Sequence, residues 1–314
     1  MLAATINDGR LTVAEHPDPE PGSGEVLIAV RAAGLNGADM IQLRGRYPAP
    51  PGWPQDIPGL ELAGEVIACG PGATRFTPGD RVMGIVGGGG QAELATVHER
   101  TLMPVPERLS WTEAGGVPDV FTTAHYAVFT QAGLRSGERL LVHGAAGGVG
   151  TAAVQLGRAA GARVTATVRN PDLRDGVRQL GADVIDPEGF AEHGPFDVIL
   201  ELVGAPNLND NLSALDTGGR IAVIGTGAGA TGEINLGALM ARRGRIHGST
   251  LRARPLEAKA DTARAMERSV LPLLASGVVA VPITASFPLS DAPQAYERFA
   301  AGGKLGKIVL EMAR

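Results

Sequence analysis

The sequence has 314 residues, a formal net charge of −5 and no long run of Lys or Arg, which argues against nucleic acid as the main partner because phosphate binding needs clustered cations. Cys69 is the only cysteine, so an internal disulfide and a cysteine-built zinc site are both excluded. The length predicts about two domains, each large enough for its own core.

Membrane and secretion signals are not found in the sequence. No stretch approaches the roughly 18 consecutive apolar residues that a spanning helix needs. The segment Met1 to Arg10 lacks the charged and apolar regions of a signal peptide. We therefore expect a cytoplasmic protein with no membrane partner.

The first hundred or so residues predict β-structure. Short apolar runs such as Glu25 to Arg31 and Leu62 to Ala68 are separated by Gly and Pro, which is typical of a small barrel or sandwich. Pro48 to Pro54 predicts an ordered loop because proline excludes helix, and Gly87 to Gly90 predicts a flexible turn.

From about Val120 onward the pattern alternates between strands and helices. Strand Arg139 to His143, helix Val149 to Ala160 and strand Arg163 to Val168 form a predicted βαβ unit. The further expected elements are helix Pro171 to Leu180, strands Asp183 to Ile185 and Phe196 to Leu202, helix Pro206 to Leu215, strand Arg220 to Gly225, helix Leu236 to Arg242, strand Arg245 to Ser249, helix Ala258 to Ala275, and strands Val278 to Ala285 and Lys307 to Glu311. Alternation of this kind is typical of a doubly wound parallel sheet in the α/β class.

A glycine motif lies between the first strand and helix of this unit. Ala145 to Gly150 has the dinucleotide spacing G-x-G-x-x-G, except that Ala145 replaces the first glycine. Gly147 allows the backbone to approach a pyrophosphate, and Gly150 allows the helix to lie close to the strand. The alternative is a purely structural turn. We expect the cofactor-binding residues to include Ala146, Gly147, Gly148, Val149 and Gly150.

The end of the second strand favours NADPH over NADH. NAD-binding proteins carry an acidic residue there that holds the ribose 2′-hydroxyl, whereas this strand ends in Val168 and Arg169. A guanidinium can bind a phosphate with two parallel hydrogen bonds. Arg169 is the first candidate and Arg174 the second. The alternative, a solvated surface arginine, stays open because Asp172 is close by and the chain is rich in Arg.

Several stretches together resemble the medium-chain dehydrogenase/reductase family, in its zinc-free quinone oxidoreductase branch. They are Gly34 to Asp39, Arg46 to Pro48, Pro58 to Glu61, Gly79 to Val82, His143 to Gly150, Gly248 to Arg252 and Gly306 to Leu310. The resemblance implies a GroES-like β-rich catalytic domain formed by residues 1–119 and 256–314, beside a Rossmann NADP-binding domain formed by residues 120–255. It also implies an active site in the cleft between them and a homodimer.

The resemblance further implies chemistry without a metal. Zinc-using relatives carry Cys and His ligands where this chain has Asn36 and Leu60, and a third ligand aligns near Asp119. One carboxylate cannot hold a catalytic zinc ion, which needs about three protein ligands. Without a Lewis acid the remaining chemistry is reduction of an acceptor that is already electron-poor.

The same resemblance assigns residues to the cleft. Asn36 and Tyr47 line the acceptor side, Thr123 lies near the nicotinamide and its ribose, and Gly225 and Lys307 belong to the cofactor site. No dedicated proton donor is evident from the sequence. Asn36 could instead cap the helix that starts at Gly37, and Tyr47 could be a packing aromatic.

These observations predict an NADPH-dependent oxidoreductase that transfers hydride to a quinone without metal. The proline-rich loop Arg44 to Trp53 carries Tyr47 and Trp53, and such a pre-ordered loop could stack a flat aromatic acceptor. The alternatives are an enone or enoyl-thioester reductase on the same scaffold, and an NADPH-sensing binding module.

Overall fold

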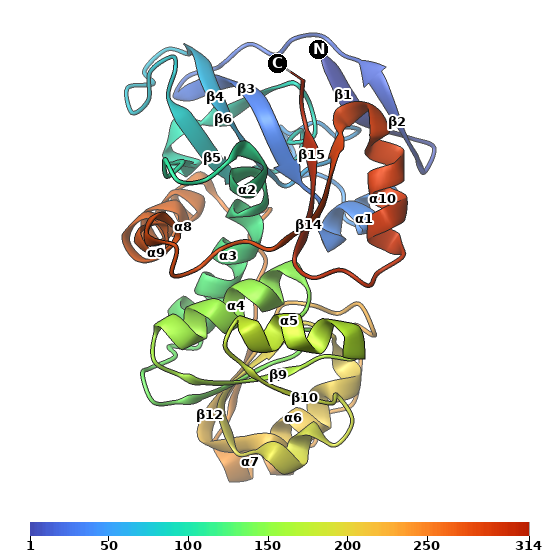
Figure 1. Ribbon diagram of the computed structural model, residues 1–314, viewed down its shortest axis with the longest axis vertical. Coiled ribbons are helices and arrows are strands. Elements are labelled where there is room, and N and C mark those ends of the chain that lie inside the picture. The colour runs from blue at the N-terminus through green and yellow to red at the C-terminus, as the bar shows by residue number, and fades with distance from the viewer. Residues whose placement is uncertain (314) are drawn as a thin grey trace.

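The computed structural model describes residues 1–313, whose two large β-sheets are arranged along the long axis of the molecule (Figure 1). A largely antiparallel sheet lies at the end that holds the N-terminus, and a parallel sheet lies at the other end. Within residues 1–313 the structure contains no helix of the length and apolar character that membrane crossing requires.

The first sheet has seven strands: six follow the order β14-β15-β3-β4-β5-β7, and the seventh, β6, pairs with β3. Its strands are β3 (Glu25–Gly34), β4 (Glu61–Cys69), β5 (Arg81–Ile85), β6 (Leu94–His98), β7 (Leu102–Pro104), β14 (Ile283–Pro288) and β15 (Lys307–Glu311). A separate hairpin is formed by β1 (Leu2–Asn7) and β2 (Arg10–Glu15). Helices α1 (Gly37–Leu43), α2 (Trp111–Gly116) and α10 (Ala292–Ala300) also belong to this half. Alternate residues of β3 are buried, as expected for a strand with one face in the core.

The second sheet has six parallel strands in the order β10-β9-β8-β11-β12-β13. They are β8 (Arg139–Val142), β9 (Arg163–Thr167), β10 (Asp183–Ile185), β11 (Phe196–Glu201), β12 (Leu215–Val223) and β13 (Arg245–Gly248). The helices between them are α4 (Gly148–Ala159), α5 (Arg174–Gln179), α6 (Leu208–Ala214) and α7 (Leu236–Arg242). This is the strand order of a doubly wound dinucleotide-binding sheet, so the predicted fold class is confirmed.

Three further helices lie between the sheets. They are α3 (Pro118–His125), which continues as a π-helical turn through Gln131, α8 (Leu256–Ser269) and α9 (Leu271–Ser276). The single helix expected from Ala258 to Ala275 is wrong, because Pro272 has no N–H and would break a continuous helix, so it occupies the first turn of α9 instead. The expected domain boundary at residue 119 falls in the first turn of α3 and stays a prediction.

The glycine run Gly87 to Gly90 is buried, so the expected flexible turn is wrong. A side-chain carbon on Gly87 would lie 2.6 Å from the ring of Trp53, and one on Gly90 would lie 2.7 Å from the backbone oxygen of Glu61. The expected strand Val278 to Ala285 also begins later, at Ile283, because the side chain of Gln155 takes up both backbone groups of Ala280.

Gly150→Ala should destabilise the protein in the absence of cofactor. A carbon added at Gly150 would lie 2.6 Å from the Cα of Ala145, whereas the nearest neighbour of one added at Gly147 is 3.4 Å away. Overpacking of this kind costs about 1–3 kcal/mol. Calorimetry without nucleotide should therefore show a clearly lower unfolding midpoint for Gly150→Ala and little change for Gly147→Ala. Equal midpoints would contradict the proposed close approach of α4 to the glycine loop.

Candidate active site

The glycine loop between β8 and α4 presents an open helix start. Gly147 lies at the N-cap of the twelve-residue helix α4, in an extended conformation. Space beside its Cα is free except for the Gly144 oxygen at 3.4 Å, which suits the close approach of a pyrophosphate. Ala146, Gly148 and Val149 are partly exposed around it, and Gly150 is buried. The residues present fit a dinucleotide.

Two further predicted cofactor residues lie at the same edge of the parallel sheet. Gly225 follows β12 and Arg169 follows β9, and the carboxyl ends of parallel strands meet at one edge. Arg169 is exposed and has no ion pair within residues 1–313. Arg174 is already engaged, because its guanidinium donates to the Val168 oxygen and to the Asp186 carboxylate. The geometry ranks Arg169 before Arg174, and both cofactor roles stay predictions.

A buried ion pair lies where the glycine loop meets the first sheet. Lys307 is 2% exposed and Glu61 is fully buried, and the Lys307 ammonium pairs with a Glu61 carboxylate oxygen. The same ammonium donates to the Asn36 side-chain oxygen at 2.7 Å and to the Leu35 carbonyl at 2.8 Å. The Asn36 amide nitrogen donates to Glu61 at 2.9 Å. The Lys307 ammonium is thus bonded to Asn36 and Glu61, and its stem passes 3.0 Å from the position that a side-chain carbon on Gly148 would occupy. Its predicted cofactor role stays a prediction.

Asn36 precedes α1, but its side chain does not cap that helix. Asp39 instead reaches back and accepts from the Asn36 backbone N–H at 2.8 Å, which leaves the Asn36 amide for Lys307 and Glu61. Asp39 also accepts from the Gly59 N–H. Burial raises the pKa of Asp39 to about 6.

Asp119 is the third carboxyl group of this region. Its backbone N–H donates to Glu61 at 2.8 Å. Burial, together with the nearby Glu61 charge, raises the pKa of Asp119 to about 7. Asp119 therefore carries a proton in part of the molecules near neutral pH, which no feature of the sequence indicated.

The three positions that align with metal ligands provide a poor donor set. They hold the amide of Asn36, the buried aliphatic side chain of Leu60 and the carboxyl group of Asp119. In the part of the chain that the structure describes, no group of three or more His, Cys, Asp or Glu side chains could hold a metal ion.

Tyr47 has a strained backbone, with φ of 126° in a region that favours glycine. Arg252 holds it there. This guanidinium is 2% exposed, donates to the Tyr47 and Gly87 carbonyls and to the Gln42 side chain, and lies 5.0 Å from the Tyr47 ring. Burial also raises the pKa of Tyr47, so its phenol remains an O–H donor at neutral pH. Strain of this kind is concentrated at functional sites.

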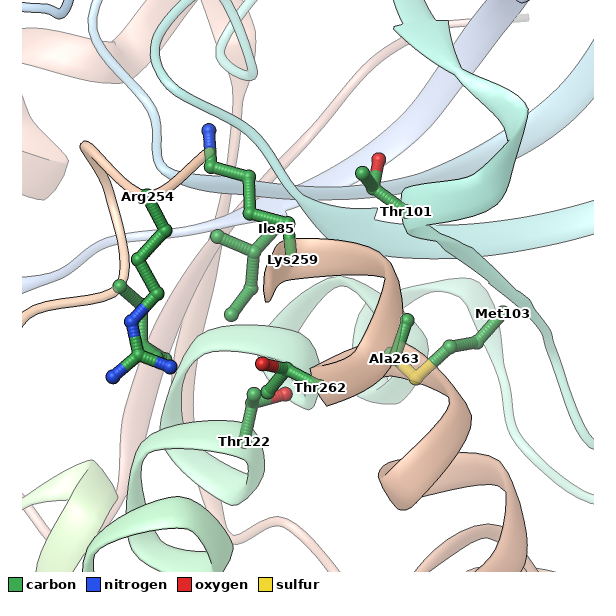
Figure 2. Close-up of a pocket in the computed structure, with 9 residues that line it drawn as sticks. Ile85, Thr101, Met103, Thr122, Arg254, Lys259, Thr262 and Ala263 are labelled. Carbon is green, nitrogen blue, oxygen red and sulfur yellow. The ribbon is translucent and has the colours of Figure 1, made fainter. Parts of the chain in front are cut away.

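A pocket adjoins this network on the side of α8 (Figure 2). Thr122 on α3 lines it, and Thr123, the predicted nicotinamide neighbour, is the next residue and is partly exposed. Trp53 of the proline-rich loop lies nearby, with the Lys259 ammonium 5.3 Å from its ring. One face of Trp53 is therefore already covered by a cation.

Comparisons with known proteins agree with this architecture. Residues 22–107 match the family "Alcohol dehydrogenase GroES-like domain" and residues 148–269 match the family "Zinc-binding dehydrogenase". Quinone oxidoreductase of Rattus norvegicus is 33% identical over 93% of this chain and 90% of its own length. The chain is a medium-chain dehydrogenase/reductase. The predicted resemblance to its quinone oxidoreductase branch is thereby confirmed.

Two other relatives extend this picture of the medium-chain dehydrogenase/reductase. Polyketide synthase GfsB of Streptomyces halstedii is 36% identical over 91% of this chain, which spans 5% of that protein. The solved structure of mycobacterial Rv1454c complexed with NADPH superposes with a TM-score of 0.89 at 27% identity, over 99% of this chain and 100% of that one. The family therefore makes this chain an oxidoreductase that uses a nicotinamide cofactor.

The buried pair leads to a prediction for this medium-chain dehydrogenase/reductase. Lys307→Met leaves Glu61 as an uncompensated buried charge, which costs about 3–5 kcal/mol, so the thermal midpoint should fall sharply. Adding Glu61→Gln removes that charge and should restore part of the loss. Lys304→Met is the control, because Lys304 has no carboxylate partner within residues 1–313. Equal effects of Lys307→Met and Lys304→Met would contradict the ion pair.

Proposed function

We propose that this protein reduces quinones with NADPH and without a metal ion. The observation that carries the proposal is the Lys307 ammonium, a fixed cation that bonds Asn36 and Glu61 in the region where zinc-using relatives hold their ion. The acceptor therefore has to be electron-poor before it binds, because the Lys307 ammonium donates to Leu35, Asn36 and Glu61 and is not free to polarise it as a metal ion would.

The cleft residues have distinct roles in this proposal. Bound nicotinamide supplies the hydride. Both ends of the Asn36 amide are occupied by Glu61 and Lys307, so Asn36 positions this network. The Tyr47 hydroxyl has no protein partner within residues 1–313 and supports a developing oxyanion on the acceptor. Quinone reduction also consumes one proton, and Asp119, with a pKa of about 7, holds one close to neutral pH.

NADPH rather than NADH is the proposed reductant, because Arg169 follows the end of β9, where a guanidinium can bind the 2′-phosphate. Arg169→Ala should raise the Kd of NADPH about tenfold or more and leave NADH binding unchanged, because a hydrogen bond to a charged group contributes about 1.5–3 kcal/mol. Arg163→Ala, at the opposite end of β9, is the matched control. Fluorescence titration of both nucleotides measures this. Equal loss of both nucleotides, or tighter binding of NADH to the unaltered protein, would remove Arg169 from the 2′-phosphate site.

Enoyl-thioester reduction is the second candidate. It is favoured by the similarity to polyketide synthases, of which GfsB is one example at 36% identity. The two reactions share hydride transfer to an electron-poor π-system, so acceptor preference distinguishes them.

The decisive experiment is steady-state oxidation of NADPH in the presence of a metal chelator. We expect 1,4-naphthoquinone and phenanthrenequinone to show higher kcat/KM than a short acyclic enone or crotonyl-CoA. A preference for crotonyl-CoA of tenfold or more, about 1.4 kcal/mol in the transition state, would overturn the quinone assignment. Loss of all activity on chelation, with about one zinc per chain by elemental analysis, would overturn the metal-free assignment.

A homodimer and a cytoplasmic location remain part of the proposal. The homodimer is supported by the outer edge of β13, which pairs with no other strand of residues 1–313, and by the exposed side chains of Leu236 and Met240 in the same half of the molecule.

A further inference from the structure

Arg252 is a buried cation whose hydrogen-bond partners are all neutral. It is 2% exposed, and its guanidinium donates to the Tyr47 and Gly87 carbonyls, each at 2.7 Å. The third acceptor is the side-chain oxygen of Gln42, at 2.6 Å. Burial lowers the pKa of Arg252, although a guanidinium remains protonated in proteins. Burying a charge against neutral groups is costly unless those groups are well placed, so these three bonds have to be precise.

The first bond acts on a backbone that would not keep its conformation alone. Tyr47 has φ of 126°, which a side chain other than glycine rarely adopts. The following residue, Pro48, further disfavours this conformation, because a residue before proline prefers an extended backbone with negative φ. Arg252 contacts Tyr47 twice, since its guanidinium bonds the carbonyl and lies 5.0 Å from the centre of the ring.

The other two bonds reach both sides of the proline-rich loop. Gln42 precedes the loop, and its amide nitrogen donates to the carbonyl of Gln55, which follows the loop, at 3.2 Å. Gly87 packs against the ring of Trp53, because a side-chain carbon on Gly87 would lie 2.6 Å from that ring. The guanidinium of Arg252 therefore contacts residues that support the start, the aromatic side chains and the end of this loop.

Arg252 also fastens this loop to the other half of the molecule. It belongs to the segment that follows β13, the last strand of the parallel sheet. That segment leaves the sheet at its carboxyl edge, beside β12, which Gly225 follows. The cofactor is expected at this edge. The position of Tyr47 is thus tied to the half that would bind the nicotinamide.

Arg252 does not itself reach an acceptor. Its Nε and both terminal nitrogens each donate to a protein oxygen, and almost none of its surface is exposed. Any effect of Arg252 on the reaction therefore has to pass through the residues that it holds.

We propose that Arg252 is a positioning residue of the acceptor site, which holds the Tyr47 backbone so that the phenol can bond the oxyanion that develops on the acceptor. The catalytic part of this inference rests on the proposed reduction reaction. Whether Arg252 holds the loop can be tested without turnover.

The first experiment measures opening of the loop by limited proteolysis with trypsin. Arg44 and Arg46 are exposed beside Tyr47, and cleavage after them follows the population of opened loop. Arg252→Met should raise this rate about tenfold relative to cleavage after Arg243, an exposed site in the parallel-sheet half. Global unfolding would raise both rates together.

Two further variants refine this measurement. Arg254→Gln is the matched control, because it removes an arginine from the same segment whose guanidinium lies over the Tyr126 ring instead, and it should leave the cleavage ratio unchanged. Arg252→Lys keeps the charge, but an ammonium cannot reproduce the planar fork of three bonds. It should therefore open the loop nearly as much as Arg252→Met.

The second experiment is a double-mutant cycle on kcat/KM for 1,4-naphthoquinone. Arg252→Met should lower this value about tenfold in the unaltered protein. In the Tyr47→Phe background it should lower it less than about twofold, because the hydroxyl that Arg252 positions is already absent. The Kd of NADPH, measured by fluorescence titration, should stay unchanged in all of these variants.

The outcomes separate this inference from the proposed function. An unchanged cleavage ratio in Arg252→Met, or full activity of Arg252→Lys, would overturn the positioning role. Equal losses of kcat/KM with and without the Tyr47 hydroxyl would show that Arg252 acts elsewhere, and would leave the quinone reductase assignment intact. Faster cleavage in a protein that reduces no quinone would support the hold on the loop and overturn that assignment.

Discussion

The buried ion pair between Lys307 and Glu61 is the interaction on which the network of the predicted active site depends. The Lys307 ammonium neutralises Glu61. One carboxylate oxygen of Glu61 accepts from Lys307 and from the Asn36 amide, and the other accepts from the backbone N–H of Asp119 in the first turn of α3. A buried carboxylate without a cation is strongly destabilising, so β15 has to lie beside β3 for this arrangement to exist. Gly34 allows the close packing, because a side-chain carbon there would lie 2.3 Å from Glu61.

The same strand also connects this network to the glycine loop. Gly306, the residue before Lys307, donates its N–H to the Ala146 oxygen of the glycine loop at 2.8 Å. Its φ of 79°, and the Pro282 oxygen 2.2 Å from where a side-chain carbon would lie, require glycine. Two consecutive residues thus contact the glycine loop, which would hold the pyrophosphate, and the network around Asn36 and Glu61.

Sequence periodicity and flanking glycines predicted the helices and strands whose bounds depend on neighbouring residues. The helix Leu236 to Arg242 and the strand Lys307 to Glu311 were predicted with the bounds that the structure shows, because periodicity and flanking Gly are short-range signals. The extension of β3 to Gly34 was not predicted, since it depends on pairing with β15 almost 280 residues later in the chain. Glu61 and Arg252 were seen only as parts of family motifs. Their roles come from partners distant in sequence, such as Lys307 and Tyr47, and a single sequence does not record such pairings.

The position of β15 also has a consequence for biosynthesis. The parallel sheet, from β8 to β13, is formed by one continuous segment and can assemble as soon as that segment has left the ribosome. The other sheet cannot, because β14 and β15 follow β13 in the chain and are translated after it. Until then Glu61 lacks its cation and the Ala32 to Gly34 end of β3 lacks its neighbour. The sheet that contains β3 therefore starts before the parallel sheet and is completed after it, and unpaired strand edges in nascent chains are sites where aggregation begins.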